Sequence, residues 1–204
     1  MIASAKRKRG NGTMAKNGVS ASTGHLAISD MAMIGLVTAV TCVLGPMSIP
    51  IFISPVPITL TNLVLYLSLY ILKTRRAFIS YVVYLLLGTV GLPVFSGFSG
   101  GLGKLMGPTG GYLAGFLFLI LIAGYFVEHW PDNRLICGAG MILGTGICYG
   151  FGTLWLCRQL ELSFMEGLGI GVFPYLIGDG AKIVLAVITG PIISKRISQA
   201  LGKI

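Results

Sequence analysis

Charged side chains are scarce in this sequence: they make up 10% of its 204 residues, and only six residues are acidic. Soluble domains carry about 25% charged residues, so this chain lacks the polar surface that would keep a folded domain in water. Apolar residues make up 54% of the chain, and the mean hydropathy is +0.87. The shortage of charge therefore excludes a water-soluble globular protein and predicts a polytopic helical membrane protein.

Several chemical motifs are also missing. The glycine-rich run 107-GPTGGY-112 lacks the GKS or GKT ending of a nucleotide phosphate loop, and no nucleophile motif is present. Neither histidine lies near an intramembrane acid. The cysteines show no CxxC or Cys/His metal spacing and are expected in the membrane core; they are Cys42, Cys137, Cys148 and Cys157. We therefore expect no enzyme, no metal and no cofactor.

Six apolar runs are each expected to cross about 30 Å of hydrocarbon as a helix. They lie near residues 27–45, 57–72, 77–92, 109–127, 134–157 and 173–194. The predicted fold is an all-α membrane protein with six transmembrane helices in one bundle, residues 25–204. Residues 1–24 are polar and basic and are predicted to be a disordered tail. The KRKR cluster of this tail is more typical of the cytoplasmic flank of a span than of a nucleic-acid site.

Basic residues predict the orientation. With the N-terminus inside, twelve of the fifteen lysines and arginines fall on the inner side, while Lys104 and Arg158 fall outside and Lys182 lies within a span. This asymmetry follows the positive-inside rule and predicts that both termini are cytoplasmic. The net charge of +9 is then an orientation signal rather than a sign of an acidic partner.

Two outer connections are unusual. Residues 45–59 carry no charge and hold four prolines among apolar residues. Such a segment either covers an apolar cavity as a lid or rests on the lipid interface. Residues 99–116 are glycine-rich, and Thr109 is placed to cap the helix that follows. The N–H groups of that helix start favour an anion, although close packing of small residues explains the same pattern.

Asp179 is the only acidic residue that falls well within a predicted span. An ionised group in hydrocarbon is costly, so its side chain is expected to face a partner or a polar cavity. Lys182 follows three residues later and lies on the same helix face. The pair indicates a binding pocket or, alternatively, a charge-neutral structural contact within the bundle.

Three stretches together, 56-VPITL-60, 91-GLPVFSGFSGGLGKLMGPTGGYLAGF-116 and 178-GDGAK-182, closely resemble the BioY family over residues 28–195. This family comprises the substrate-binding S components of energy-coupling-factor (ECF) biotin transporters. The resemblance implies a six-helix bundle in the bacterial plasma membrane that captures biotin from outside. It also implies a transmembrane coupling subunit and two cytoplasmic ATPases as partners. The chain departs from the family pattern at Thr61, usually glutamine, and at Gly180 and Ala181, which replace bulkier residues.

The biotin ring suggests roles for these residues. Its ureido group offers two N–H donors to Asp179, while Lys182 either donates to the ureido carbonyl or steadies Asp179. The carboxylate is expected near Lys104 or the helix start after Thr109, and Tyr112 is a candidate to pack on the bicyclic ring. The expected substrate-binding residues are Ser99, Gly100, Gly101, Lys104, Thr109, Gly110, Gly111, Tyr112, Asp179 and Lys182.

The first span offers a face of small residues, Ala32, Gly35 and Ala39, for docking to the coupling subunit or for packing within the bundle. The resulting prediction is high-affinity biotin capture for import without bond chemistry. Alternatives are an S component for another small vitamin, or a membrane-embedded enzyme that uses Asp179 as a general base.

Overall fold

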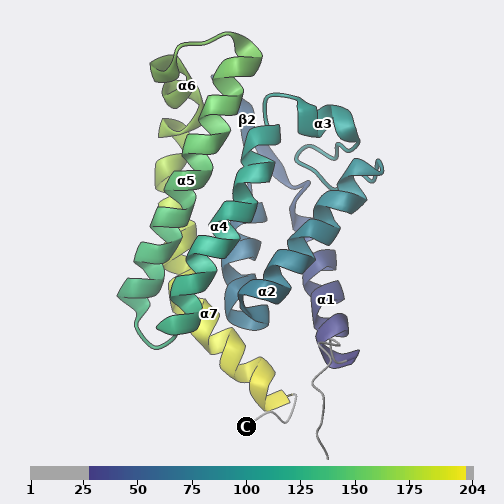
Figure 1. The fold of residues 1–204 in the computed structure, drawn as a ribbon, viewed down its shortest axis with the longest axis vertical. Coiled ribbons are helices and arrows are strands. Elements are labelled where there is room, and N and C mark those ends of the chain that lie inside the picture. Colours follow the sequence, from purple (N-terminus) through teal and green to yellow (C-terminus); the bar gives the residue numbers. More distant parts are fainter. Residues whose placement is uncertain (1–27, 201–204) are drawn as a thin grey trace, which may run out of the picture.

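The computed structural model describes residues 28–200, so the predicted tail at residues 1–24 lies outside the described residues (Figure 1). Five long helices form the body of the molecule: α1 (Ile28–Leu44), α2 (Thr61–Thr89), α4 (Gly110–His129), α5 (Arg134–Leu160) and α7 (Leu176–Ala200). Short elements lie between them: β1 (Ser48–Ile51), β2 (Ser54–Thr59), α3 (Leu102–Met106), α6 (Phe164–Gly171) and the 3₁₀ turn η1 (Phe173–Tyr175). The fold is mainly helical, as the sequence predicts.

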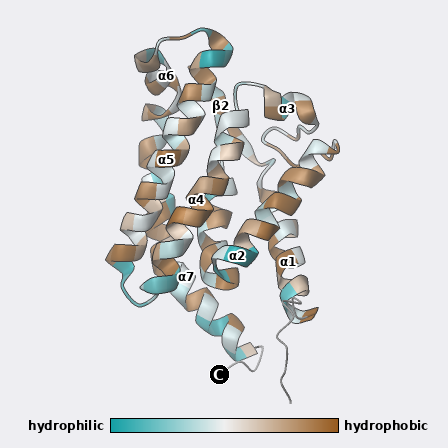
Figure 2. Cartoon of the chain, viewed as in Figure 1, coloured by the Kyte–Doolittle hydropathy of each residue, from teal (hydrophilic) through white to brown (hydrophobic). Residues whose placement is uncertain are grey.

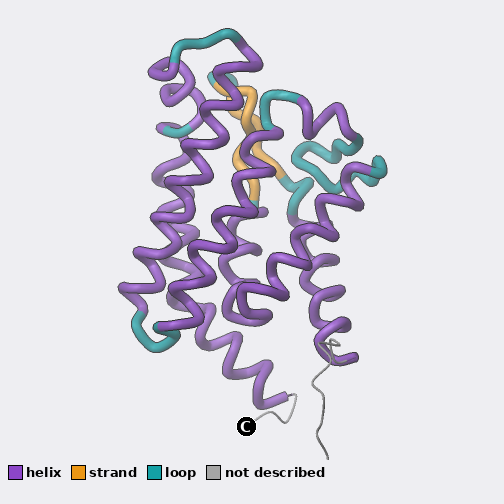
Figure 3. Tube along the Cα trace, viewed as in Figure 1, coloured by secondary structure: helices purple, strands orange, loops and turns teal. Residues whose placement is uncertain are grey.

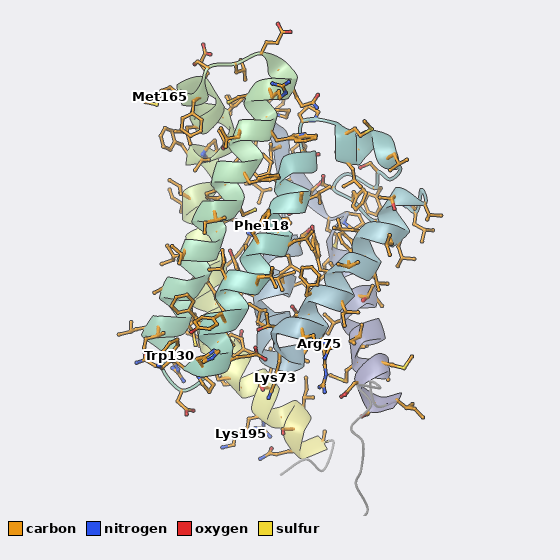
Figure 4. All side chains as sticks on the ribbon, in the orientation of Figure 1. Lys73, Arg75, Phe118, Trp130, Met165 and Lys195 are labelled. Atoms are coloured by element: carbon orange, nitrogen blue, oxygen red, sulfur yellow. The ribbon has the colours of Figure 1, made fainter. Side chains whose placement is uncertain are left out.

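The predicted second and third spans form the two parts of α2. Lys73 interrupts this helix with φ 63° and ψ 169°, a conformation that is not helical. Lys73 lies at one end of the molecule, so the chain turns there between two helical segments (Figure 4). The first segment begins at Thr61, four residues after the predicted start of the span at 57, because β2 continues to Thr59.

Residues 45–59 form a β-hairpin rather than an irregular loop. Strands β1 and β2 pair antiparallel, with Ser48 opposite Thr59 and Ile51 opposite Ser54, and Figure 3 shows the hairpin among the helices. The hairpin adds a small two-stranded sheet to the otherwise helical fold of the described residues. Prolines normally argue against strands because they lack an N–H, but a two-stranded sheet leaves every strand with an open edge that tolerates them.

Helices α4 and α5 pack closely through glycines. A methyl group on Gly111 of α4 would overlap the Trp155 side chain, and one on Gly152 of α5 would overlap the Tyr112 ring. The missing side chains let the two backbones approach, as small residues do in membrane bundles. Asn133 caps the start of helix α5, where its side-chain oxygen accepts from the N–H groups of Leu135 and Ile136 at 3.1 and 3.2 Å.

Apolar side chains cover the outer surface of the bundle. Leu135 is 86% exposed and Ile177 is 87% exposed, and Figure 2 shows hydrophobic residues along the length of the helices. Exposure of this extent suits contact with lipid rather than water. Within residues 28–200, three segments are apolar enough, by length and composition, to cross a membrane: Gly110–His129, Arg134–Leu160 and Phe164–Ala200.

The ends of α1 and α7 that lie nearest the termini are at the same end of the bundle (Figure 1). Lys73, Arg75 and Lys195 lie at this end, and Met165 lies at the opposite end (Figure 4). Arg76 forms a 2.6 Å ion pair with Asp30, which ties α2 to the start of α1. These four basic residues thus gather at the end of the bundle nearest the termini.

Candidate substrate-binding site

A cavity that is partly open to solvent lies between β2 and helices α2, α4, α5 and α7. Strand β2 contributes Val56, Pro57 and Ile58 to an apolar wall, and α4 contributes Leu113 and Phe116. Its polar lining residues are Thr59, Thr61, Asn62, Tyr84, Ser96, Thr109, Tyr112, Thr145, Tyr149, Tyr175, Asp179 and Lys182. A hollow in which apolar walls meet convergent polar groups is typical of a small-molecule site.

Asp179 and Lys182 form an ion pair on the wall contributed by α7. The Lys182 Nζ lies 2.9 Å from Asp179 Oδ1, and the two side chains are 12% and 13% exposed, respectively. They are three residues apart and therefore share one face of the helix. The sequence places both residues inside a span, and the structure shows that they meet each other and the cavity.

The Lys182 ammonium joins three elements. Besides Asp179, it donates to the Thr59 carbonyl oxygen at 2.6 Å and to Asn62 Oδ1 at 3.0 Å. An ammonium group has three hydrogens, so each has an acceptor in this arrangement. Lys182 thereby holds the end of β2 and the start of α2 against α7.

Tyr149 of α5 donates to Asp179 Oδ2 at 2.5 Å, so each carboxylate oxygen has one protein partner. Tyr149 also lines the cavity, and its hydroxyl oxygen has lone pairs that can accept. The sequence interpretation did not single out this residue. A tyrosine in an apolar helix is expected to find a polar partner, but eight tyrosines in the chain carry that same signal.

A second set of polar contacts holds the hairpin near the start of β2. The Tyr175 hydroxyl donates to the Val56 carbonyl and lies 2.8 Å from the Ser54 hydroxyl. Tyr175 belongs to η1, directly before α7. Strand β2 is therefore attached at both of its ends, by Tyr175 near its start and by Lys182 at Thr59.

Two of the predicted residues from the glycine-rich stretch line the cavity, Thr109 and Tyr112. Thr109 occupies the N-cap position of α4, but the side-chain capping hydrogen bond that the sequence predicts is not formed. The Tyr112 hydroxyl donates to the Gly171 carbonyl at 3.1 Å and lies 3.3 Å from the Thr153 hydroxyl. It therefore joins α4 to α5 and to the end of α6.

The other predicted residues of this stretch lie outside the cavity lining. Ser99 pairs with Phe95 in an isolated antiparallel bridge, and Gly101 has φ 88°, a conformation that glycine adopts without strain. Side chains at Gly100, Gly110 and Gly111 would collide with neighbouring chain atoms, so these glycines serve close packing. Lys104 lies in α3, half-buried, and this burial lowers its pKa below the usual value for lysine.

The small residues predicted for docking all lie on the exposed face of α1: Ala32, Gly35 and Ala39. A methyl group built at Gly35 has no neighbour within 4 Å. Gly35 and Ala39 also line an apolar groove between α1 and α2, whose far wall includes Ile79 and Val83. Packing within the chain therefore does not use this face.

The family-level profile of the BioY family matches residues 14–199. The chain belongs to the BioY family. It is 33% identical to biotin transporter BioY2 of Lactococcus lactis subsp. cremoris (strain MG1363), an alignment that covers 83% of this chain and 92% of that protein. It is 43% identical to the probable biotin transporter BioY of Bacillus subtilis (strain 168), over 87% and 90% of the two chains.

The fold agrees with this membership. The crystal structure of the S-component for biotin from an ECF-type ABC transporter superposes with a TM-score of 0.77 at 28% identity, covering 82% of this chain and 92% of that one. The resemblance that the sequence suggested is thus confirmed at the level of family and fold. Because members of the BioY family are transporters, the cavity is considered as a substrate-binding site rather than a catalytic one.

Proposed function

We propose that this chain captures biotin from the external side as the substrate-specific subunit of an ECF-type transporter. The observation that carries the proposal is the network of Tyr149, Asp179, Lys182 and Asn62 on the wall of a mainly apolar cavity. Biotin transporters among the relatives and a biotin S-component among the solved structures support the choice of ligand.

The ureido ring of biotin matches the hydrogen-bonding capacity that this network leaves free. Asp179 has one protein partner on each oxygen, so it retains lone pairs for a ureido N–H, and the Tyr149 hydroxyl oxygen can accept from the other N–H. Asn62 Oδ1 is engaged by Lys182 and by the Leu63 N–H, and Tyr66 also interacts with the Asn62 side chain. The amide nitrogen carries two hydrogens, so one can serve the ureido carbonyl. In this arrangement Lys182 positions Asp179 and Asn62.

The apolar wall suits the remainder of the ligand. The thiophane ring and the methylene chain of biotin carry no hydrogen-bonding groups apart from the terminal carboxylate. Val56 and Ile58 on one side and Leu113 and Phe116 on the other offer contact with these parts. Burial of apolar ligand surface contributes roughly 25 cal/mol per Å². The apolar body would supply affinity, while the polar network would supply specificity.

We further propose a six-span topology with both termini in the cytoplasm of a bacterium. The support is the position of Lys73, Arg75 and Lys195 at the end of the bundle where α1 begins and α7 finishes (Figure 4). The capture site then opens toward the outside, and uptake requires partners: a transmembrane coupling subunit and two ATPases. The groove beside Gly35 and Ala39 is the proposed docking face for the coupling subunit.

Isothermal titration calorimetry on the purified protein in detergent tests the ligand assignment. Biotin is expected to bind with one-to-one stoichiometry, and riboflavin and thiamine are expected to give no heat of binding. The Asp179→Asn variant should lose most of the affinity. Tight binding of another vitamin without binding of biotin would refute the substrate while leaving the fold assignment intact.

A further inference from the structure

We propose that the site recognises the cyclic urea of its ligand and makes no ionic contact with the carboxylate, so that neutral carboxamides and esters of biotin bind as well as biotin itself. This inference rests on the proposed function of biotin capture. It extends the substrate class from one acid to ureido-ring ligands with substituted side chains. Three features of the described chain support it.

The cavity lining is electrically neutral. Of its lining residues only Asp179 and Lys182 carry charge, and these opposite charges neutralise each other at 2.9 Å. A ligand carboxylate enclosed by this lining would be a buried anion without a counter-ion, which is strongly unfavourable. A free carboxylate is therefore expected to stay in water at the open side of the cavity rather than inside it.

The one cation in the lining has no donor to offer. Each of the three Lys182 hydrogens is engaged, by Thr59, Asn62 and Asp179. A carboxylate that reached Lys182 would have to displace one of these acceptors. Displacing the Thr59 carbonyl would detach β2 from α7, and displacing Asp179 would leave its carboxylate without a cation in a 13% exposed position.

Other described cations lie outside the lining. Lys104 is on α3, and neither it nor any other residue of α3 lines the cavity. Lys73, Arg75 and Lys195 lie at the far end of the bundle (Figure 4). The segments on either side of α3 contribute Ser96 and Thr109 to the lining, and these bring hydroxyl groups rather than charges. These hydroxyl groups can donate to an amide or ester carbonyl oxygen without any cation.

Titration of the wild-type protein with biotin, its primary carboxamide, an N-alkyl carboxamide and its methyl ester tests the proposal. The four dissociation constants are expected to agree within about threefold, and biotin affinity should not change between low and high salt. Had a cation held the carboxylate, charge-assisted hydrogen bonds would separate the acid from the amide by about 10- to 150-fold. A tenfold or greater preference for the acid overturns the proposal.

The Lys104→Met variant tests the alternative, in which the Lys104 ammonium binds the ligand carboxylate. If it loses affinity for biotin but not for the carboxamide, Lys104 moves to hold the carboxylate and the proposal is wrong. Equal affinities for acid and amide in both proteins support it. Failure of the proposed function has a different signature, because biotin and all three derivatives would then fail to bind the wild-type protein.

Discussion

The Asp179–Lys182 pair permits a double-mutant cycle that separates a structural role from a binding role. In Lys182→Met the carboxylate remains in the cavity wall without its cation, and in Asp179→Asn the ammonium remains without its anion. Both side chains are less than 15% exposed, at 13% and 12%. Removing one partner of a buried pair costs about 3–5 kcal/mol, because it leaves an uncompensated charge.

This cost predicts a measurable thermal shift. Each kcal/mol lowers the Tm of a chain of this size by about 2–4 °C, so each single variant should melt about 6–20 °C below the wild type. The Asp179→Asn, Lys182→Met double variant carries no buried charge, and its asparagine still accepts from Tyr149. Its loss of stability should be no larger than that of either single variant, rather than their sum.

Binding decides between the two roles. We expect the double variant to fold and yet bind biotin at least ~100-fold more weakly than the wild type, because the ureido ring loses a charged acceptor worth several kcal/mol. Thermal unfolding in detergent and calorimetric titration provide the two measurements. The control is Lys195→Met, an exposed lysine at the other end of α7, which should shift the Tm by no more than about 2 °C. Normal biotin affinity in a stable double variant would show that the pair serves the bundle alone.

Three further outcomes are expected. Tyr149→Phe removes the 2.5 Å hydrogen bond to the carboxylate and should weaken biotin binding about tenfold in calorimetry. Tyr125→Phe changes a half-exposed ring outside the cavity lining and should leave binding unchanged. Gly111→Ala introduces a methyl group against Trp155 and should cost about 1–3 kcal/mol in thermal unfolding, whereas Gly146→Ala, in open space on α5, should be neutral or stabilising. Gly35→Leu should leave biotin affinity intact and reduce co-purification of the coupling subunit, because it places a bulky side chain in the groove beside α1. The matched control is Gly146→Leu, another glycine in open space. Equal recovery of the subunit by both variants would contradict the proposed docking face.

The hydrophobic runs predicted most of the helices well, because a membrane span needs a local stretch of apolar residues and little else. Helices α1, α4 and α5 begin and end within three residues of the runs at 27–45, 109–127 and 134–157. The break between the second and third runs appears at Lys73. The β-hairpin was missed because its four prolines and lack of polar alternation resemble an irregular loop, and strand pairing is not visible in hydropathy.

The sequence also identified the costly charges but not their partners. Asp179 and Lys182 stand out because any charge in an apolar run requires compensation. Tyr149 is 30 residues from Asp179 and Asn62 is 120 residues from Lys182, so no local spacing links them. The glycines between residues 99 and 111 were the reverse case. Their pattern suggested close approach of a ligand, but in the structure most of them serve turns and close packing.

By itself, the sequence determined that this chain enters a membrane, where its helices run, which end is basic and which two charges need explanation. These properties depend on residue type and local order, which hydropathy and charge record directly. Only the tertiary structure decided that β2 forms a cavity wall, that Tyr149 and Asn62 complete the polar network, and that Lys182 has no donor left for a ligand. Those facts depend on the rotation and packing of helices that are distant in sequence, and local pattern carries no information about either.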